Sequence, residues 1–371
     1  MTINRLLYLA LLSASLLGAT GCQRDSDRSL AVAAETGLYS DSAAAKVAAY
    51  HDTTGRSADD RLAGGVRMIP ISTPQGNFKV WTKRVGHSPR MKVLILHGGP
   101  GMTHEAYEAF DSYLPQEGIE YYYYDQLGSA NSDQPKDLRL WSLPRFVEEV
   151  EQVRRALKLD SSNFYLLGHS WGGILAMQYA LKYQRHLKGL VISNMVASMP
   201  EYDTYAHQVL GPKLKPDVLK EILAFEAKKD YGNPRYMKLI EENYYPEHVL
   251  RMPLDKWPEP VQRSFRHVNS QVYVSMQGQS EFGVSKGATL SNWDVKAQLP
   301  TLTVPTLAIG AEHDTMDPAQ MKWIADHVQH GRYHYCPNGS HMAMYDDQQT
   351  YFKGLTRFIH DVDGGTFPAA K

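Results

Sequence analysis

The sequence predicts an α/β fold with a mostly parallel central sheet and one helical segment inserted into it. Short continuous apolar runs recur along the chain, as in strands that are buried on both faces of a sheet. Segments with helical apolar spacing lie between these runs, and one long stretch interrupts the alternation. Alternating strands and helices produce a parallel sheet with helices on both faces. The length of 371 residues is sufficient for such a domain and an insertion.

The apolar runs predict six strands. The first, at residues 93–96, ends at a glycine-rich turn, 97–101, that contains no helix former. The other strands are expected at 119–124, 164–167, 190–192, 306–309 and 332–336. Helices are expected where apolar residues recur along one face, at 143–157, 174–183, 319–330 and 351–362.

The alternation stops between residues 199 and 300, where helical spacing and many charges replace the apolar runs. We expect this segment to form a helical cap over the carboxyl ends of the strands, where ligands bind in open α/β sheets. The core then comprises residues 65–198 and 301–362, and residues 363–371 form a C-terminal tail.

Residues 1–22 have the pattern of a bacterial lipoprotein signal peptide. Arg5 precedes an apolar run that is too short for a permanent membrane span, and small residues precede Cys22. We expect Cys22 to become the lipidated N-terminus, which anchors the protein to a membrane of the bacterial cell envelope. Gln23 favours the outer membrane, facing the periplasm, and an ordinary secretory signal is the alternative. Residues 23–64 are rich in Ala, Ser, Asp and Thr and predict a flexible tether.

The composition narrows the class of protein further. Lys and Arg total 39 and Asp and Glu total 40, a balance that gives no electrostatic basis for binding nucleic acid. The 23 Tyr, 10 Phe and 6 Trp residues exclude disorder over most of the chain. Two cysteines cannot form a disulfide framework, and Cys336 is expected to be a buried apolar residue.

Residues 168–172 read Gly-His-Ser-Trp-Gly and match the motif G-x-S-x-G between a predicted strand and a predicted helix. This context resembles the nucleophile elbow of α/β-hydrolases, a sharp turn that exposes a serine. Glycine is needed at both ends of the motif because the turn leaves no room for a side chain. Ser170 is therefore the predicted nucleophile.

A serine hydroxyl needs a base to take its proton and an acid to orient that base. In α/β-hydrolases the chain order is serine, acid, histidine. Asp314 and His341 both follow the carboxyl ends of predicted strands, so both can reach the edge of the sheet that carries Ser170. The alternative acids are Asp317, Asp346 and Asp347, and the alternative histidines are His313 and His97.

The oxyanion formed during attack needs two backbone N–H donors. Trp171, at the start of the helix after Ser170, is expected to supply one of them. Gly99, in the glycine-rich turn, is expected to supply the other, with Gly98 as the alternative. His97 is expected to brace this turn through side-chain hydrogen bonds. This chemistry requires no metal and no cofactor.

The chain resembles the proline iminopeptidase family of α/β-hydrolases and the related amino-acid amidases. The matching segments are 97–101 (His-Gly-Gly-Pro-Gly), 124–128 (Tyr-Asp-Gln-Leu-Gly), 168–173, 310–318 and 339–341, which spread over most of residues 70–362. The first two motifs are much more specific to this family than G-x-S-x-G, which the whole superfamily shares. His169 departs from the family, which often has a small residue there. Leu127 and residues 130–131 stand where arginine is common, and Leu127 is closer to the amidase branch.

The resemblance implies release of an N-terminal proline or other small residue from short peptides, or hydrolysis of amino-acid amides. A desolvated substrate ammonium needs carboxylate partners, which the family places in its cap. Glu281 and then Glu247 are the expected partners, with Glu242 as an alternative. Four aromatic residues are candidates for the wall of an apolar pocket for the proline ring, and the alternative is that they belong to the core: Trp171, Tyr244, Tyr245 and Phe282. The alternatives are a carboxylesterase or lactonase with the same residues, and a non-catalytic binding lipoprotein of the cell envelope.

Overall fold

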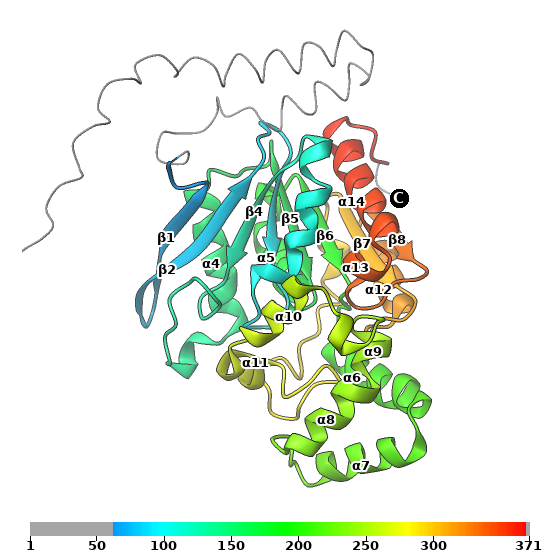
Figure 1. Ribbon diagram of the computed structural model, residues 1–371. Coiled ribbons are helices and arrows are strands. Elements are labelled where there is room, and N and C mark those ends of the chain that lie inside the picture. The colour runs from blue at the N-terminus through cyan, green and yellow to red at the C-terminus, as the bar shows by residue number, and fades with distance from the viewer. Residues whose placement is uncertain (1–61, 369–371) are drawn as a thin grey trace, which may run out of the picture. The chain divides into compact units, whose positions relative to one another are not determined.

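The computed structural model describes residues 62–368, so the predicted signal peptide and nearly all of the predicted tether lie outside the described residues. Eight strands form one sheet in the order β1-β2-β4-β3-β5-β6-β7-β8 (Figure 1). Their bounds are β1 Val66–Thr73, β2 Gly76–Val85, β3 Lys92–Leu96, β4 Glu120–Asp125, β5 Phe164–His169, β6 Gly189–Ser193, β7 Thr306–Ala311 and β8 Gly331–Cys336. The pairs β1–β2 and β2–β4 are antiparallel and all other pairs are parallel.

Strands β3 to β8 lie within two residues of the strands that the apolar runs predict. The hairpin of β1 and β2 is an addition that those runs do not indicate. In β1 exposed and buried residues are mixed, and Pro70 lies within the strand. Such a half-exposed edge strand lacks the continuous apolar run of the central strands.

Two layers of helices cover the sheet. One face packs against α4 (Leu143–Ala156), α5 (Trp171–Tyr183) and α12 (Pro318–His327). The other face packs against α14 (Gln348–Asp363) and a 3₁₀ helix, His104–Ser112, with the short helix α13 (Ala343–Asp346) before α14. Successive strand residues alternate between these layers, so Leu94 belongs to the first and Val93 to the second. Cys336 is buried in the second layer, as the sequence predicts.

Three helix ends lie three residues from the predicted ones, and one of them is the start of α14, which begins at Gln348. Helix α5 begins at Trp171, three residues before the expected start, because the tight turn at Ser170 leads directly into the helix. Helix α12 ends at His327 because the backbone becomes extended at Val328, just before the chain enters β8.

Between β6 and β7 the chain forms a set of helices, called the cap below. These are α6 (Met199–Tyr205), α7 (Pro216–Ala227), α8 (Pro234–Asn243), α9 (Tyr245–His248), α10 (Glu259–Arg266) and α11 (Ser270–Met276). Figure 1 shows α6 to α9 gathered at one end of the sheet. An antiparallel bridge between Ser198 and Asp294 ties together the two ends of the cap. Because only residues 194–198 separate the carboxyl end of β6 from α6, this bridge holds the cap near the carboxyl ends of the strands.

The cap shares its apolar interior with the core. Leu239, Tyr244 and Trp257 of the cap belong to the same buried cluster as Phe352 and Phe358 of α14. Burial of apolar side chains in one continuous cluster is the main stabilising contribution to such an arrangement. Among residues 62–368, no helix has both the length and the apolar character needed to cross a bilayer.

Candidate active site

Ser170 occupies a strained turn between β5 and α5. Its φ and ψ are 56° and −127°, a conformation that residues with a side chain rarely adopt. A Cβ atom on Gly168 would overlap the carbonyl oxygen of Gly172, and one on Gly172 would overlap the carbonyl oxygen of Leu96. The turn therefore forms only with glycine at both positions, for the steric reason that the motif suggests.

His341 and Asp314 form a buried hydrogen-bonded pair. The imidazole Nδ1 of His341 lies 2.8 Å from Oδ1 of Asp314. The other carboxylate oxygen accepts a hydrogen bond from the side-chain amide of Asn194 at 2.7 Å, and the Met316 N–H donates to Oδ1 at 3.0 Å. Because Nδ1 of His341 donates to the carboxylate, its Nε2 is left to accept a proton.

The electrostatics of the pair favour the protonated imidazole. Burial lowers the pKa of His341, but the charge and the hydrogen bond of Asp314 outweigh burial and leave the pKa above its ordinary value. A general base with a raised pKa accepts a proton more readily, provided that the pH keeps it neutral at rest.

Ser170, His341 and Glu281 line one cavity, called the Ser170 cavity below. Its apolar wall is formed by Met102, Ala106, Val249, Phe265 and Met342. The free space is about 20 Å³, enough for about one water molecule. Ser170 is 5% exposed and His341 is 4% exposed, so the candidate reacting groups are shielded from bulk solvent.

The alternative acids have other contacts. Asp317 caps the N-terminus of α12 by accepting from the Ala319 N–H at 2.8 Å. Asp346 accepts from the Ser340 N–H at 3.0 Å, and Asp347 accepts from the Asn338 N–H at 3.1 Å. The last two therefore brace the loop that carries His341.

His97 braces the glycine-rich turn, as the sequence predicts. Its Nδ1–H donates to the carbonyl oxygen of Gly98 at 2.8 Å, and its Nε2 accepts from the Gln126 N–H at 3.1 Å. Burial lowers the pKa of His97 to about 4, so the ring is neutral near pH 7.

Gln126 connects this turn to the residue after the candidate nucleophile. Its side-chain nitrogen donates to the carbonyl oxygen of His97 at 3.2 Å, and its side-chain oxygen accepts from the indole N–H of Trp171 at 2.8 Å. The motif Tyr-Asp-Gln indicated the family, but it did not indicate this role, because the contact joins residues 45 positions apart in the chain.

The geometry favours Gly99 over Gly98 as the second oxyanion donor. The N–H of Gly98 already donates to the hydroxyl of Tyr107 at 2.8 Å. Gly99 has a φ of 111°, and a Cβ there would lie 2.7 Å from the Met102 nitrogen, so only glycine fits. Trp171 is the first residue of α5, and the first N–H groups of a helix have no acceptor within the helix.

Glu281 is a buried carboxylate held by three tyrosines of the cap. The Tyr202 hydroxyl donates to its carbonyl oxygen at 2.6 Å, the Tyr245 hydroxyl accepts from its N–H at 3.4 Å, and the Tyr273 hydroxyl donates to its carboxylate. Burial raises the pKa of Glu281 above its ordinary value. A cation that enters the Ser170 cavity would offset this penalty.

The structure does not bring Glu247 or Glu242 to the cavity. Both side chains are exposed, and Glu242 lies 3.7 Å from Lys238 on the surface of α8. Helix α9 turns Tyr245 and His248 inward, which leaves Glu247 on the outer side. The expectation that Glu247 faces a substrate ammonium is therefore wrong for this structure.

The expected aromatic wall is also wrong. The indole of Trp171 packs edge-on against Phe146, with ring centroids 5.3 Å apart, and Tyr244 and Tyr245 are buried inside the cap. Phe282 lines a different cavity. These rings support the surroundings of the Ser170 cavity but do not line it.

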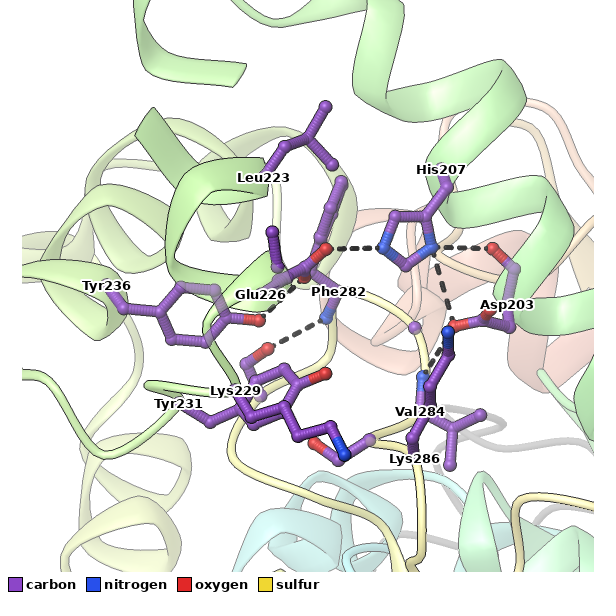
Figure 2. Close-up of a pocket in the computed structure, with 14 residues that line it drawn as sticks. Asp203, His207, Leu223, Glu226, Lys229, Tyr231, Tyr236, Phe282, Val284 and Lys286 are labelled. Carbon is purple, nitrogen blue, oxygen red and sulfur yellow. Dashed lines mark hydrogen bonds and ion pairs between the residues drawn. The ribbon is translucent and has the colours of Figure 1, made fainter. Parts of the chain in front are cut away.

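That second cavity, called the cap cavity below, has a volume of about 360 Å³. Figure 2 shows His207 between the carboxylates of Glu226 and Asp203 at this cavity. The segment 280–283 separates the two cavities: Glu281 lines the Ser170 cavity, and its neighbours Ser280 and Phe282 line the cap cavity. The backbone N–H of Val284 donates to Asp203 at 3.1 Å, which ties this segment to α6.

His248, a cap residue that the sequence analysis missed, joins the loops of Asp314 and His341. Its Nδ1–H donates to the carbonyl oxygen of His313 at 2.9 Å, and its own carbonyl oxygen accepts from the His341 N–H at 3.0 Å. No local pattern in the sequence marks these contacts.

Within the described part of the chain, no three His, Cys, Asp or Glu side chains are grouped to hold a metal ion.

Comparison with known proteins identifies the family. Residues 92–348 match the family described as alpha/beta hydrolase fold. The chain is 58% identical over 300 residues to the proline iminopeptidase of Elizabethkingia meningoseptica, a match that covers 81% of this chain and 100% of that protein. It is 57% identical to the proline iminopeptidase of Flavobacterium johnsoniae, over 80% of this chain and 98% of that one.

A solved structure gives the same result. The crystal structure of proline iminopeptidase from Mycobacterium smegmatis matches with a TM-score of 0.71 and 28% identity, and the match covers 81% of this chain and 99% of that chain. The chain belongs to the proline iminopeptidase family of α/β-hydrolases.

Proposed function

We propose that this protein is a serine exopeptidase that releases an N-terminal proline, or another small residue, from short peptides or amino-acid amides. The observation that carries the proposal is the Ser170 cavity, where one buried carboxylate, Glu281, faces a serine and a histidine–aspartate pair. A carboxylate beside the nucleophile selects substrates with a free ammonium next to the scissile bond. The relatives named proline iminopeptidase support the same reading.

In the first half of the proposed reaction, Glu281 binds the substrate ammonium. The Ser170 Oγ attacks the scissile carbonyl carbon while Nε2 of His341 takes the hydroxyl proton, and Asp314 stabilises the imidazolium that forms. The N–H groups of Gly99 and Trp171 bind the oxyanion. Each such donor typically lowers the barrier by about 3 kcal/mol.

In the second half, the tetrahedral intermediate collapses and the C–N bond breaks. His341 gives its proton to the leaving amine, and the N-terminal residue remains as an ester on Ser170. A water molecule then attacks the ester, with His341 again as the base, and the free amino acid leaves. The resting state of Ser170 and His341 is restored.

The test is a panel of substrates with free and blocked amines: prolyl- and alanyl-anilides, their N-acetylated forms, proline amide and short simple esters. We expect kcat/KM to be highest for free-amine substrates and to fall by at least ten-fold on N-acetylation. A preference for N-acetylated substrates or simple esters would support the carboxylesterase or lactonase alternative instead. Absence of any hydrolysis would support the binding-protein alternative.

We also propose that lipidated Cys22 anchors the protein to the cell envelope, facing the periplasm from the outer membrane. The supporting observation is the residue pattern of positions 1–22, which lie outside the described residues. In a Gram-negative host, the wild type should fractionate with the outer membrane and need detergent for extraction. Cys22→Ala should lose this association; membrane association unchanged in that variant would refute the anchor.

A further inference from the structure

The residue before the candidate nucleophile, His169, lies at the centre of a buried chain of hydrogen bonds. It is the last residue of β5, and its ring contacts two others. The His169 and Tyr107 ring centroids are 5.7 Å apart, and the His169 and His341 ring centroids are 4.9 Å apart. Tyr107 comes from the 3₁₀ helix after the glycine-rich turn, so the chain connects three separate segments.

The direction of every hydrogen bond in this chain is fixed by its two ends. At one end the Gly98 N–H donates to the Tyr107 hydroxyl at 2.8 Å. At the other end the carbonyl oxygen of His341, which can only accept, lies 2.8 Å from Nε2 of His169. Nε2 therefore carries the proton, and Nδ1 accepts from the Tyr107 hydroxyl at 2.9 Å.

This series of hydrogen bonds requires a neutral His169. A second proton, on Nδ1, would face the Tyr107 oxygen and break the sequence of donors and acceptors. Burial lowers the pKa of His169 to about 3, which agrees with a neutral ring at any pH near 7. Tyr107, His169 and His341 are each at least 95% buried, so water does not readily replace these hydrogen bonds.

We propose that Tyr107 and His169 are positioning residues that fix the glycine-rich turn, residues 97–101, relative to the loop of His341. Gly98 is adjacent to the candidate donor Gly99, and the His341 carbonyl belongs to the candidate base. These hydrogen bonds thus join the segment of the candidate oxyanion donor to the loop of the candidate base. Errors of a fraction of an ångström between such groups lower the rate of the chemical step.

The main test replaces Tyr107 by Phe, which removes one hydroxyl and keeps the ring. The Gly98 N–H then has no acceptor in the chain, and Nδ1 of His169 has no donor. We expect kcat to fall by about ten-fold with KM within two-fold of the wild type, because an interaction that matters in the transition state is lost. The matched control is Tyr165→Phe on β5, the strand that ends at His169; this change removes a buried hydroxyl that donates to the Ile359 carbonyl at 3.2 Å. It should leave kcat unchanged.

A rescue series separates positioning from general packing. His169→Leu removes both bonds of the ring and should lower kcat by about 100-fold. His169→Gln places an amide nitrogen near the position of Nε2, so it keeps a donor for the His341 carbonyl and should recover about ten-fold of that loss. Because Tyr107→Phe and His169→Gln break the same bond, the double variant should be no slower than either single variant.

The inference rests on the proposed function, but the two fail separately. The assays use the best substrate of the wild type, whether amide or ester, and active sites are counted by labelling with an organophosphonate. A Tyr107→Phe enzyme with the wild-type kcat, an effect on KM alone, or additive losses in the double variant would overturn the inference. Loss of the free-amine requirement in the wild type would overturn only the exopeptidase function.

Discussion

The side-chain amide of Asn194 donates a hydrogen bond to Asp314 over 2.7 Å, on the side of the carboxylate away from His341. The Met316 N–H donates to the other oxygen at 3.0 Å, so both carboxylate oxygens accept bonds besides the one from His341. An amide at position 314 would therefore place its NH₂ group against a donor on either side. The hydrogen bonds around position 314 therefore require a carboxylate there.

Asp314→Asn should lower kcat by about 10⁴-fold, because the amide no longer favours the imidazole tautomer with its proton on Nδ1. KM should change little. The control is Asp317→Asn, three residues away, which alters only the side-chain hydrogen bond at the N-terminus of α12. It should keep full activity, so equal losses in the two variants would contradict the assignment.

Glu281→Gln should raise KM for free-amine substrates by about 10- to 100-fold, because one charged hydrogen bond contributes about 1.5–3 kcal/mol. KM for simple esters should stay near the wild-type value. Glu247→Gln is the matched control, since that residue is exposed on the outer side of α9. A loss of ammonium recognition in the Glu247 variant, and not in the Glu281 variant, would reverse our placement of the substrate.

The pH dependence of kcat/KM should have an acid limb set by two groups. His341 must be neutral to act as a base, and its raised pKa moves the loss of activity to higher pH than for an ordinary histidine. Glu281 must be ionised to bind an ammonium, and its raised pKa adds a second loss as the pH falls. Profiles for a prolyl-anilide should steepen at low pH in the wild type but follow a single group in Glu281→Gln. Identical pH profiles for the wild type and Glu281→Gln would argue against a carboxylate at the ammonium site.

His207 should stabilise the cap in a pH-dependent way. Burial lowers its pKa, but the bond to Glu226 and the contacts with Asp203 outweigh burial and raise the pKa to about 9. Its contribution is therefore complete below the ordinary histidine pKa and disappears as the pH rises through about 9. His207→Gln should lower the free energy of unfolding by about 2 kcal/mol at pH 7 and by much less at pH 10, measured by urea denaturation. A difference that does not depend on pH would show that the charge is not involved.

Much of the fold follows from local patterns in the sequence. Strands buried on both faces appear as apolar runs, and the chemistry at their carboxyl ends appears as short motifs, so β3 to β8 and the neighbourhood of Ser170, Asp314 and His341 could be predicted. The hairpin β1–β2 could not, because half-exposed strands have mixed sequences.

The details of the cap depend on which side of a helix faces inward, and the sequence leaves this open. Glu281 and Glu247 both have an aromatic residue within two positions in the sequence, yet only Glu281 lines the Ser170 cavity. Gln126, His169 and His248 have supporting roles because they contact residues that are 45 to 172 positions away in the chain. His169 and His248 contact backbone carbonyl oxygens, which no sequence motif marks. Such contacts become visible only in three dimensions.

The most direct test of the account is the hydrolysis of a prolyl-anilide by Ser170→Ala, together with intact-protein mass after treatment with an organophosphonate. We expect the variant to lose at least 10⁴-fold in kcat, to keep the wild-type unfolding temperature within a few degrees and to gain no phosphonyl mass. The wild type should gain one phosphonyl group, located on Ser170. Hydrolysis that survives in the variant, or a label on another residue, would contradict the account.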